Sequence, residues 1–149
     1  MAAAQTPKPV SGETLSEVTS SIVALYRDHF GRGPTAAKTY ALDDVIVCVL
    51  RNGLTVIERT LFNGGKADTV RMMRAAFQDA VAERFTSSIE ELTGAKVLAF
   101  MSQAHVDPDL AIEVFFLDRP VAQFAVNEEV ITTDVVDELG DRTDAEESA

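Results

Sequence analysis

The longest regular pattern in the sequence runs from about residue 67 to residue 92, and it constrains the fold more than any other feature. Apolar side chains recur there at steps of three and four residues, the period of an α-helix: Val70, Met73, Phe77, Val81, Phe85, Ile89 and Leu92. Gly94 then offers a natural helix end. A helix of roughly 25 residues is more than twice the globular average. In a chain of 149 residues we expect it to span a small sheet, and it is long enough to project beyond that sheet.

Another helical pattern lies near the N-terminus and is followed by a predicted corner. Thr14 and Glu17 have the spacing of a capping box, which satisfies free amides at a helix start. The apolar stripe after them consists of Leu15, Val18, Ile22, Leu25 and His29. Gly31 suits the residue after the last helical turn, and Pro34 prevents the chain from continuing as a helix. The segment FGRGPTAAKTYALDD at 30–44 is therefore predicted to be a helix stop and a rigid corner.

Three apolar runs have the composition of strands. After Asp44, DVIVCVL at 44–50 is a continuous β-branched and apolar run, which suits a strand that is covered on both faces or centrally placed. KVLAFMSQAH at 96–105 and LAIEVFFLD at 110–118 flank a proline-containing turn and predict a hairpin. A short helix begins near Thr55, three residues before Glu58, which repeats the capping-box spacing. The order favours an α+β fold, with a three-stranded, mostly antiparallel sheet and helices packed on one face.

Charge divides the chain into a leader, a body and a tail. The net charge is −11, and residues 121–149 alone hold nine acidic side chains and one basic. We predict a disordered leader at 1–12, one α+β domain at 13–120, and an acidic, largely disordered tail at 121–149. The acidity disfavours nucleic acid and bare anionic membranes as partners.

The sequence offers no segment for membrane insertion. No apolar run reaches the roughly 20 residues that a spanning helix needs, and the N-terminus lacks the pattern of a signal peptide. The single cysteine, Cys48, cannot form an internal disulfide and lies in an apolar run. We therefore expect a cytoplasmic protein with a buried thiol.

Five side chains are candidates for holding an anion or a partner's carboxylate. A corner does not need Arg32, Lys38 or Tyr40, and their polar groups could bind such a group. Arg71 and Arg74 stand near the beginning of the long helix, where cations oppose the helix dipole. Arginines and exposed amides that converge there would make an anion site. A solvated helix face explains the same two arginines without any ligand.

Metal binding and catalysis find little support in the sequence. His105, Asp107 and Asp109 have the ligand types for a divalent ion, but aspartates at a hairpin tip usually cap the turn. Cys48 has no cationic neighbour in sequence that would lower its thiol pKa. His29 and His105 belong to no recognisable catalytic motif. We expect no metal site, no cofactor and no enzymatic activity.

Two long segments resemble the MpsC-like domain family. They are ALYRDHFGRGPTAAKTYALDDVIVCVLRNGLTVIERTL at 24–61 and RAAFQDAVAERFTSSIEELTGAKVLAFMSQAHVDPDLAIEVFFLD at 74–118. Gly-Arg-Gly-Pro-Thr, Phe-Gln-Asp, and Phe-Met-Ser-Gln before the His-x-Asp-Pro-Asp turn carry the resemblance. The family name refers to a sodium-translocating, membrane-potential-generating system. The resemblance implies a soluble accessory protein beside membrane subunits linked to cation flux and inorganic-carbon uptake, and it brings no catalytic residues.

The leading hypothesis is a non-enzymatic accessory or regulatory protein that binds a partner and forms a homodimer, across the apolar sheet or along the long helix. A membrane protein is the partner that the resemblance adds, which would place the chain at the periphery of a membrane complex.

A second hypothesis is a small-anion binding module that uses Arg32, Lys38, Arg71 and Arg74. A third is a KH-like RNA binder, because Asn63-Gly64-Gly65-Lys66 joins two predicted helices between strands. The overall acidity opposes this third hypothesis.

Overall fold

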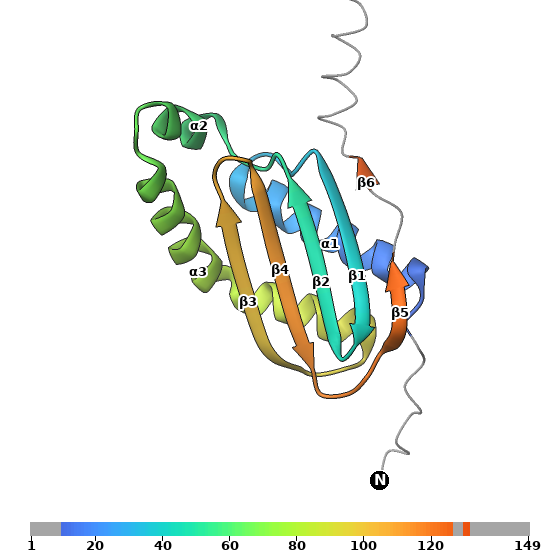
Figure 1. The fold of residues 1–149 in the computed structure, drawn as a ribbon. Coiled ribbons are helices and arrows are strands. Elements are labelled where there is room, and N and C mark those ends of the chain that lie inside the picture. The colour runs from blue at the N-terminus through green and yellow to red at the C-terminus, as the bar shows by residue number, and fades with distance from the viewer. Residues whose placement is uncertain (1–9, 127–129, 132–149) are drawn as a thin grey trace, which may run out of the picture.

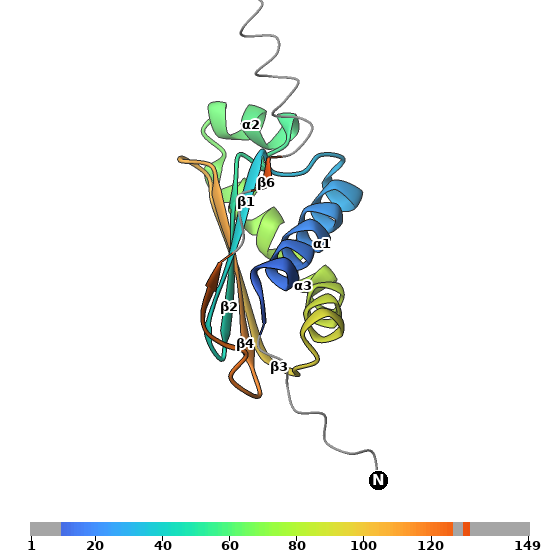
Figure 2. The ribbon, with the colours of Figure 1, turned by 90° about the vertical axis from the view of Figure 1, so that its right-hand side faces the viewer.

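The computed structural model describes residues 10–126 and 130–131 of the chain. Its strands form one antiparallel sheet, and α1 and α3 cover a single face of that sheet (Figures 1 and 2). The elements, in chain order, are α1 (Gly12–Phe30), β1 (Ala36–Asp43), β2 (Val45–Arg51), α2 (Val56–Asn63), α3 (Ala67–Thr93), β3 (Val97–His105), β4 (Leu110–Leu117), β5 (Ala122–Val126) and β6 (Val130–Ile131).

The sheet is larger than the three strands predicted. Its order is β3-β4-β2-β1-β5, and the short β6 also pairs with β1. The α+β class and the helices on one face are confirmed, whereas the number of strands is wrong. The strand β1 lies inside the segment that was predicted to be a corner. It pairs with β2 along its whole length, from Ala36 opposite Arg51 to Leu42 opposite Val45. Its mixed sequence has no strong strand signal, so the pairing with β2 makes it a strand.

The helix boundaries follow the capping chemistry in most places. The capping box of Thr55 and Glu58 is present in α2, as predicted. Gly31 ends α1 in the left-handed region, with φ 78°, and its amide donates to the Arg27 carbonyl. The start of α1 differs, because Ser11 rather than Thr14 is the N-cap. The long helix is confirmed as α3, with 27 residues and Gly94 as its cap.

The main core lies between the sheet and the pair α1 and α3. Alternating positions of β2 and β4 point into it, among them Ile46, Cys48 and Phe115. The Cys48 thiol is fully buried, and this burial raises its pKa to about 12. The buried thiol expected from the sequence is thus confirmed. A smaller cluster around Leu54, Val70 and Val106 joins α2 to the beginning of α3.

The sheet extends beyond the domain end predicted at residue 120, because β5 and β6 both pair with β1. Residues 1–9, 127–129 and 132–149 lie outside the described part of the chain. The disorder expected of the leader and of the end of the tail therefore stays a prediction. None of the helices in the described part combines the length and the apolarity of a membrane span.

Candidate functional site

Two arginines from distant parts of the chain meet at the turn of residues 52–54, here called the clamped turn. The Arg32 guanidinium donates to the carbonyl oxygens of Asn52, at 3.3 Å, and of Leu54, at 3.2 Å. The Arg74 guanidinium donates to the carbonyl oxygen of Gly53 at 2.9 Å. Every carbonyl of the clamped turn thus accepts a hydrogen bond from a cation, which is stronger than a bond between neutral groups.

The hairpin tip between β3 and β4 holds the clamped turn from its amide side. The Asp109 carboxylate accepts hydrogen bonds from the backbone amides of Gly53, at 3.2 Å, and Leu54, at 3.0 Å. His105 contacts the Pro108 carbonyl through Nδ1 at 2.8 Å, within the same tip. Asp109 therefore acts as a cap, the role that turn aspartates usually take. Within residues 10–126 and 130–131, no group of three or more His, Cys, Asp or Glu side chains is placed to hold a metal ion.

Arg74 also forms a buried ion pair with Glu58 of α2. Its Nε donates to Oε2 and its Nη2 to Oε1, both at 2.6 Å, and the two side chains are only 3% and 1% exposed. Burial alone would raise the pKa of the Glu58 carboxyl, but the bonds from Arg74 and from the Thr55 amide hold that pKa below its ordinary value. The guanidinium lies 3.9 Å from the centroid of the Phe30 ring. This geometry locks α1, α2 and α3 together.

A second buried polar group lies between the helices and the sheet. The Tyr26 hydroxyl of α1 donates to Oε1 of Glu113 on β4 at 2.5 Å. Burial raises the pKa of Glu113 to about 7, although hydrogen bonds from Ser102 and Tyr26 and the charge of Arg74 act in the opposite direction. Ser102 is the cross-strand neighbour of Glu113, and Gln78 of α3 is also buried beside Tyr26.

The other candidates for anion binding are placed differently. Lys38 and Tyr40 both lie on β1, with the Lys38 ammonium 5.7 Å from the centroid of the Tyr40 ring. Arg71 is exposed on α3 and pairs with Asp68 at 2.6 Å. The structure thus brings together only Arg32 and Arg74 of the predicted set, and it directs their donors to carbonyls and to Glu58. Anion binding by the whole set stays a prediction that no common site supports.

The face of the sheet that is turned away from α1 and α3 has an apolar centre on β2 and β4, and we call it the open sheet face. Strand alternation places Val47 and Val49 of β2, and Ile112 and Val114 of β4, on this face. Figure 2 shows no helix over it in the described part of the chain. The large side chain of Met101 on β3 is 59% exposed. Exposed apolar areas of this kind are common at the binding surfaces of proteins.

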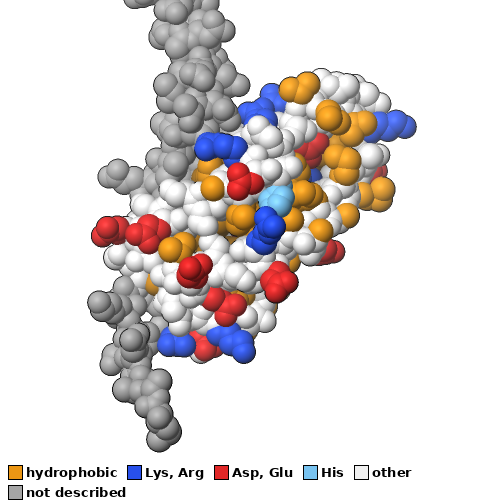
Figure 3. Space-filling model, turned by 180° about the vertical axis from the view of Figure 1, so that it is seen from behind, with side chains coloured by type: hydrophobic (Ala, Val, Ile, Leu, Met, Phe, Trp, Pro, Cys, Tyr) orange, Lys and Arg blue, Asp and Glu red, His pale blue; other side chains and the backbone are white. Residues whose placement is uncertain are grey.

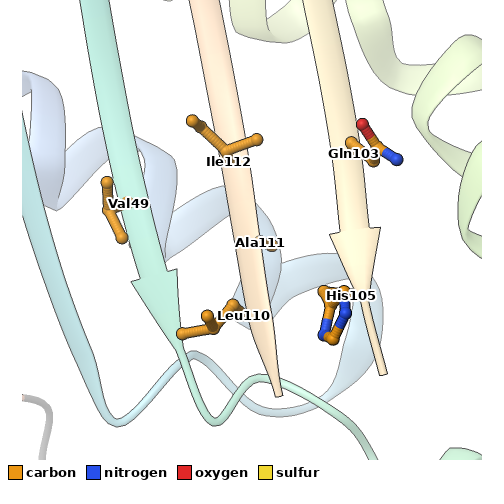
Figure 4. Close-up of a pocket in the computed structure, with 6 residues that line it drawn as sticks. All are labelled: Val49, Gln103, His105, Leu110, Ala111 and Ile112. Atoms are coloured by element: carbon orange, nitrogen blue, oxygen red, sulfur yellow. The ribbon is translucent and has the colours of Figure 1, made fainter. Parts of the chain in front are cut away.

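A shallow hollow of about 370 Å³ lies at one end of the open sheet face (Figure 4). Val49, Leu110 and Ile112 supply apolar walls, while Gln103 and His105 of β3 stand along one side. The polar atoms in the hollow are few, and they include no carboxylate. The hollow therefore suits an apolar side chain of a partner better than a charged small molecule.

The sequence reasoning missed Glu58, Glu113 and Gln78 as buried polar groups. A signal was present for α3, since Arg74 and Gln78 follow Val70 at steps of four residues in the buried stripe. Met73, which was assigned to that stripe, is 45% exposed instead. Glu113 also occupies an inward position in the alternation of β4. Its partner Tyr26 is 87 residues away, so only the folded chain reveals the contact.

The comparisons with known proteins agree with one another. A family model described as Na+-translocating membrane potential-generating system (MpsC) matches residues 11–119. An uncharacterized protein, YrhF of Bacillus subtilis strain 168, is 27% identical over 111 residues, which cover 72% of this chain and 89% of YrhF. No solved structure matches the chain significantly.

Proposed function

The chain belongs to the MpsC family, and on that premise we propose that it is a non-enzymatic accessory protein that works by binding other proteins through the open sheet face. The family description ties its members to a Na+-translocating, membrane-potential-generating system. The proposed place of the chain is in the cytoplasm, at the periphery of such a system. The first partner that we assign to the open sheet face is a second copy of the chain.

The apolar centre of the open sheet face is the observation that carries this proposal. The outward side chains of β2 and β4 are apolar, except for Arg51 at the end of β2. Glu113 is the charged residue within β4, and it points inward to the core. Lys38 of β1, opposite Val49, borders this apolar strip with a single positive charge, and Tyr40 stands beside it. The strip between them and β3 offers a charged partner nothing to select. It is compatible with itself, because sheets pack face to face through apolar side chains and a twofold axis brings identical strands together.

The size of the face also fits a dimer. Five strands at about 4.8 Å spacing, each about seven residues long, give a face of roughly 550 Å² per copy, or about 1,100 Å² in total. This estimate falls near the lower end of specific interfaces, which corresponds to a dimer of moderate affinity. Such a dimer could exchange its second copy for a membrane subunit.

The buried charges favour a structural role over a catalytic one. The Arg74–Glu58 pair and the Arg32 and Asp109 bonds are all used inside the protein, at the clamped turn. Cys48 is buried and has a raised pKa, which opposes a nucleophilic role. These observations support an accessory protein without enzymatic activity.

Size-exclusion chromatography with light scattering tests the proposal on the full chain. We expect a dimer whose fraction rises with concentration, and we expect Met101→Arg on the open sheet face to produce a monomer. Met72→Arg is the matched control, because Met72 on α3 is similarly exposed, at 68%. This control should stay dimeric. A wild-type chain that is monomeric at high micromolar concentration, or two arginine variants that behave alike, would refute the dimer across this face.

A further inference from the structure

A separate exposed apolar surface lies where α2 meets the beginning of α3, and we call it the α2–α3 patch. Val56 and Ile57 of α2 are 75% and 70% exposed, and Met72 and Met73 of α3 are also exposed. Figure 3 shows hydrophobic side chains gathered at this end of the molecule, with basic side chains at their borders. The two helices are joined on their inner side by the cluster around Val70. The outward apolar residues therefore do not belong to either core.

Basic side chains accompany the α2–α3 patch. Arg59 of α2 and Arg71 of α3 are about half exposed, and Lys66 stands between the two helices. Two exposed acids stand next to them: Asp68, which pairs with Arg71, and Asp107, which lines the same hollow as Arg59. Arg59 lies 3.8 Å from Asp109, whose oxygens already accept two backbone amides. The patch thus combines apolar area with three basic side chains, of which Arg59 and Arg71 have acids beside them and Lys66 is in no ion pair within the described part of the chain. An apolar occupant that carries acids suits this combination.

The C-terminal segment of the chain departs from the same end of the sheet. Ile131 of β6 pairs with Ala36 of β1, and Ala36 in turn pairs with Arg51 at the end of β2. After Arg51 the chain enters the clamped turn and then α2. Figure 1 shows β6 and α2 at the same end of the molecule. Two strand spacings, about 10 Å, separate β6 from β2. The 18 residues from 132 to 149 can extend by up to about 60 Å, which is ample for reaching α2.

The composition of this segment matches the patch. Residues 132–149 contain seven acidic side chains and one basic. Within them, DVVDELGD at 134–141 places Val135, Val136 and Leu139 among four acids. This is the composition that an apolar surface with basic borders would bind. An anionic membrane is a poorer occupant, because the charge of the segment would repel it from this end of the molecule.

We propose that residues 134–141 dock in cis on the α2–α3 patch, with their valines and leucine on the apolar side chains and their acids near Arg59, Lys66 and Arg71. Tethering to β6 places the segment at a millimolar effective concentration, so a contact of weak intrinsic affinity suffices to keep it bound for most of the time. The patch would then be open to a competing acidic segment of another protein only when the tail is displaced.

Hydrogen exchange measured by mass spectrometry on the full chain tests this docking. We expect amides of 134–141 to exchange about tenfold more slowly than in a synthetic peptide of residues 132–149, as for a tethered contact with a dissociation constant near 0.1 mM. The double variant Ile57→Ser with Met72→Ser should restore the peptide rate. The matched control is Leu42→Ser with Met101→Ser, two similarly exposed positions on the sheet. It should keep the protection, whether or not the chain still dimerises.

Further outcomes decide the identity of the occupant. Salt and charge-removing substitutions test whether the acids contribute to docking. Slowed exchange at 134–141 that weakens in 0.5 M salt, and also in the double variant Asp137→Asn with Glu138→Gln, supports their contribution. Exchange at the free-peptide rate in the wild-type chain would overturn the proposal, as would equal protection in the patch variant. Protection that disappears on dilution would assign the patch to the tail of a second copy and overturn docking in cis. Cosedimentation of the wild-type chain with phosphatidylglycerol vesicles, together with free-peptide exchange in its tail, would assign it to a lipid surface instead.

Discussion

The Glu113→Gln substitution should stabilise the protein at alkaline pH and remove part of its pH dependence. Glu113 is fully buried, and its pKa is raised from 4.5 to about 7. The unfolded chain ionises this carboxyl near its ordinary pKa, whereas the folded chain keeps it protonated up to about pH 7. Its contribution to stability is therefore complete below pH 4.5 and is lost as the pH rises toward and through 7. A shift of this size corresponds to about 3 kcal/mol of unfolding free energy.

The groups that face Glu113 define what the substitution changes. Tyr26 of α1 donates to it, Arg74 of α3 supplies a positive charge, and Cys48 of β2 is its cross-strand neighbour. A glutamine side chain keeps the volume and can still accept the Tyr26 hydrogen bond, but it never ionises. We expect the variant to match the wild type near pH 5 and to exceed its unfolding free energy at pH 8, by up to about 3 kcal/mol.

Urea unfolding at several pH values between 5 and 8 measures this difference. The control is Glu91→Gln, because Glu91 is exposed on α3 and its substitution should leave the pH profile of the wild type unchanged. If the Glu113→Gln variant loses stability between pH 5 and 8 as steeply as the wild type does, Glu113 does not carry the effect and the reasoning from its burial is wrong.

Two further experiments test the other buried groups, one on the Arg74–Glu58 ion pair and one on the Cys48 thiol. Arg74→Met leaves the Glu58 carboxylate buried without its cation, and it should lower the unfolding free energy by about 3–5 kcal/mol in urea titrations. Adding Glu58→Met should recover part of that loss, and a double variant less stable than Arg74→Met alone would contradict the ion-pair argument. The Cys48 thiol, with a pKa of about 12, should react with a thiol reagent at pH 8 only as fast as the chain unfolds. A reaction in the native protein as fast as in urea would refute its burial.

Local signals explain what could be predicted. The long helix, the capping box of α2 and the left-handed Gly31 depend on residues within a few positions of one another, and all were predicted correctly. The apolar run around Cys48 likewise predicts a buried strand, because its own composition suits no other position. The α+β class follows from the order of these elements.

Partners distant in sequence explain the errors. Strand β1 has a mixed composition, and it becomes a strand because it pairs with β2, the next strand in the chain, and with β5, which is about 80 residues away. The predicted corner is confirmed for residues 31–35, which join α1 to β1 and include Pro34, but the rest of the predicted segment is strand. The candidate arginines were also interpreted from their neighbours in sequence, and those neighbours do not bind them. Arg74 is separated from Glu58 by 16 residues, and Arg32 from Leu54 by 22.

The sequence by itself determined that this protein is an α+β domain with one long helix and a buried thiol, and that it belongs to the MpsC family, because periodicity, capping and motif spacing are local properties. The tertiary structure alone decided that the sheet leaves open one face with an apolar centre, that Arg32, Arg74 and Asp109 hold a single turn, and that Glu113 is buried beside Tyr26. These features depend on which strands pair and which helices cross. Strand pairing and helix packing join residues that are far apart in sequence, and the free energy of such contacts cannot be inferred from the neighbours of each residue.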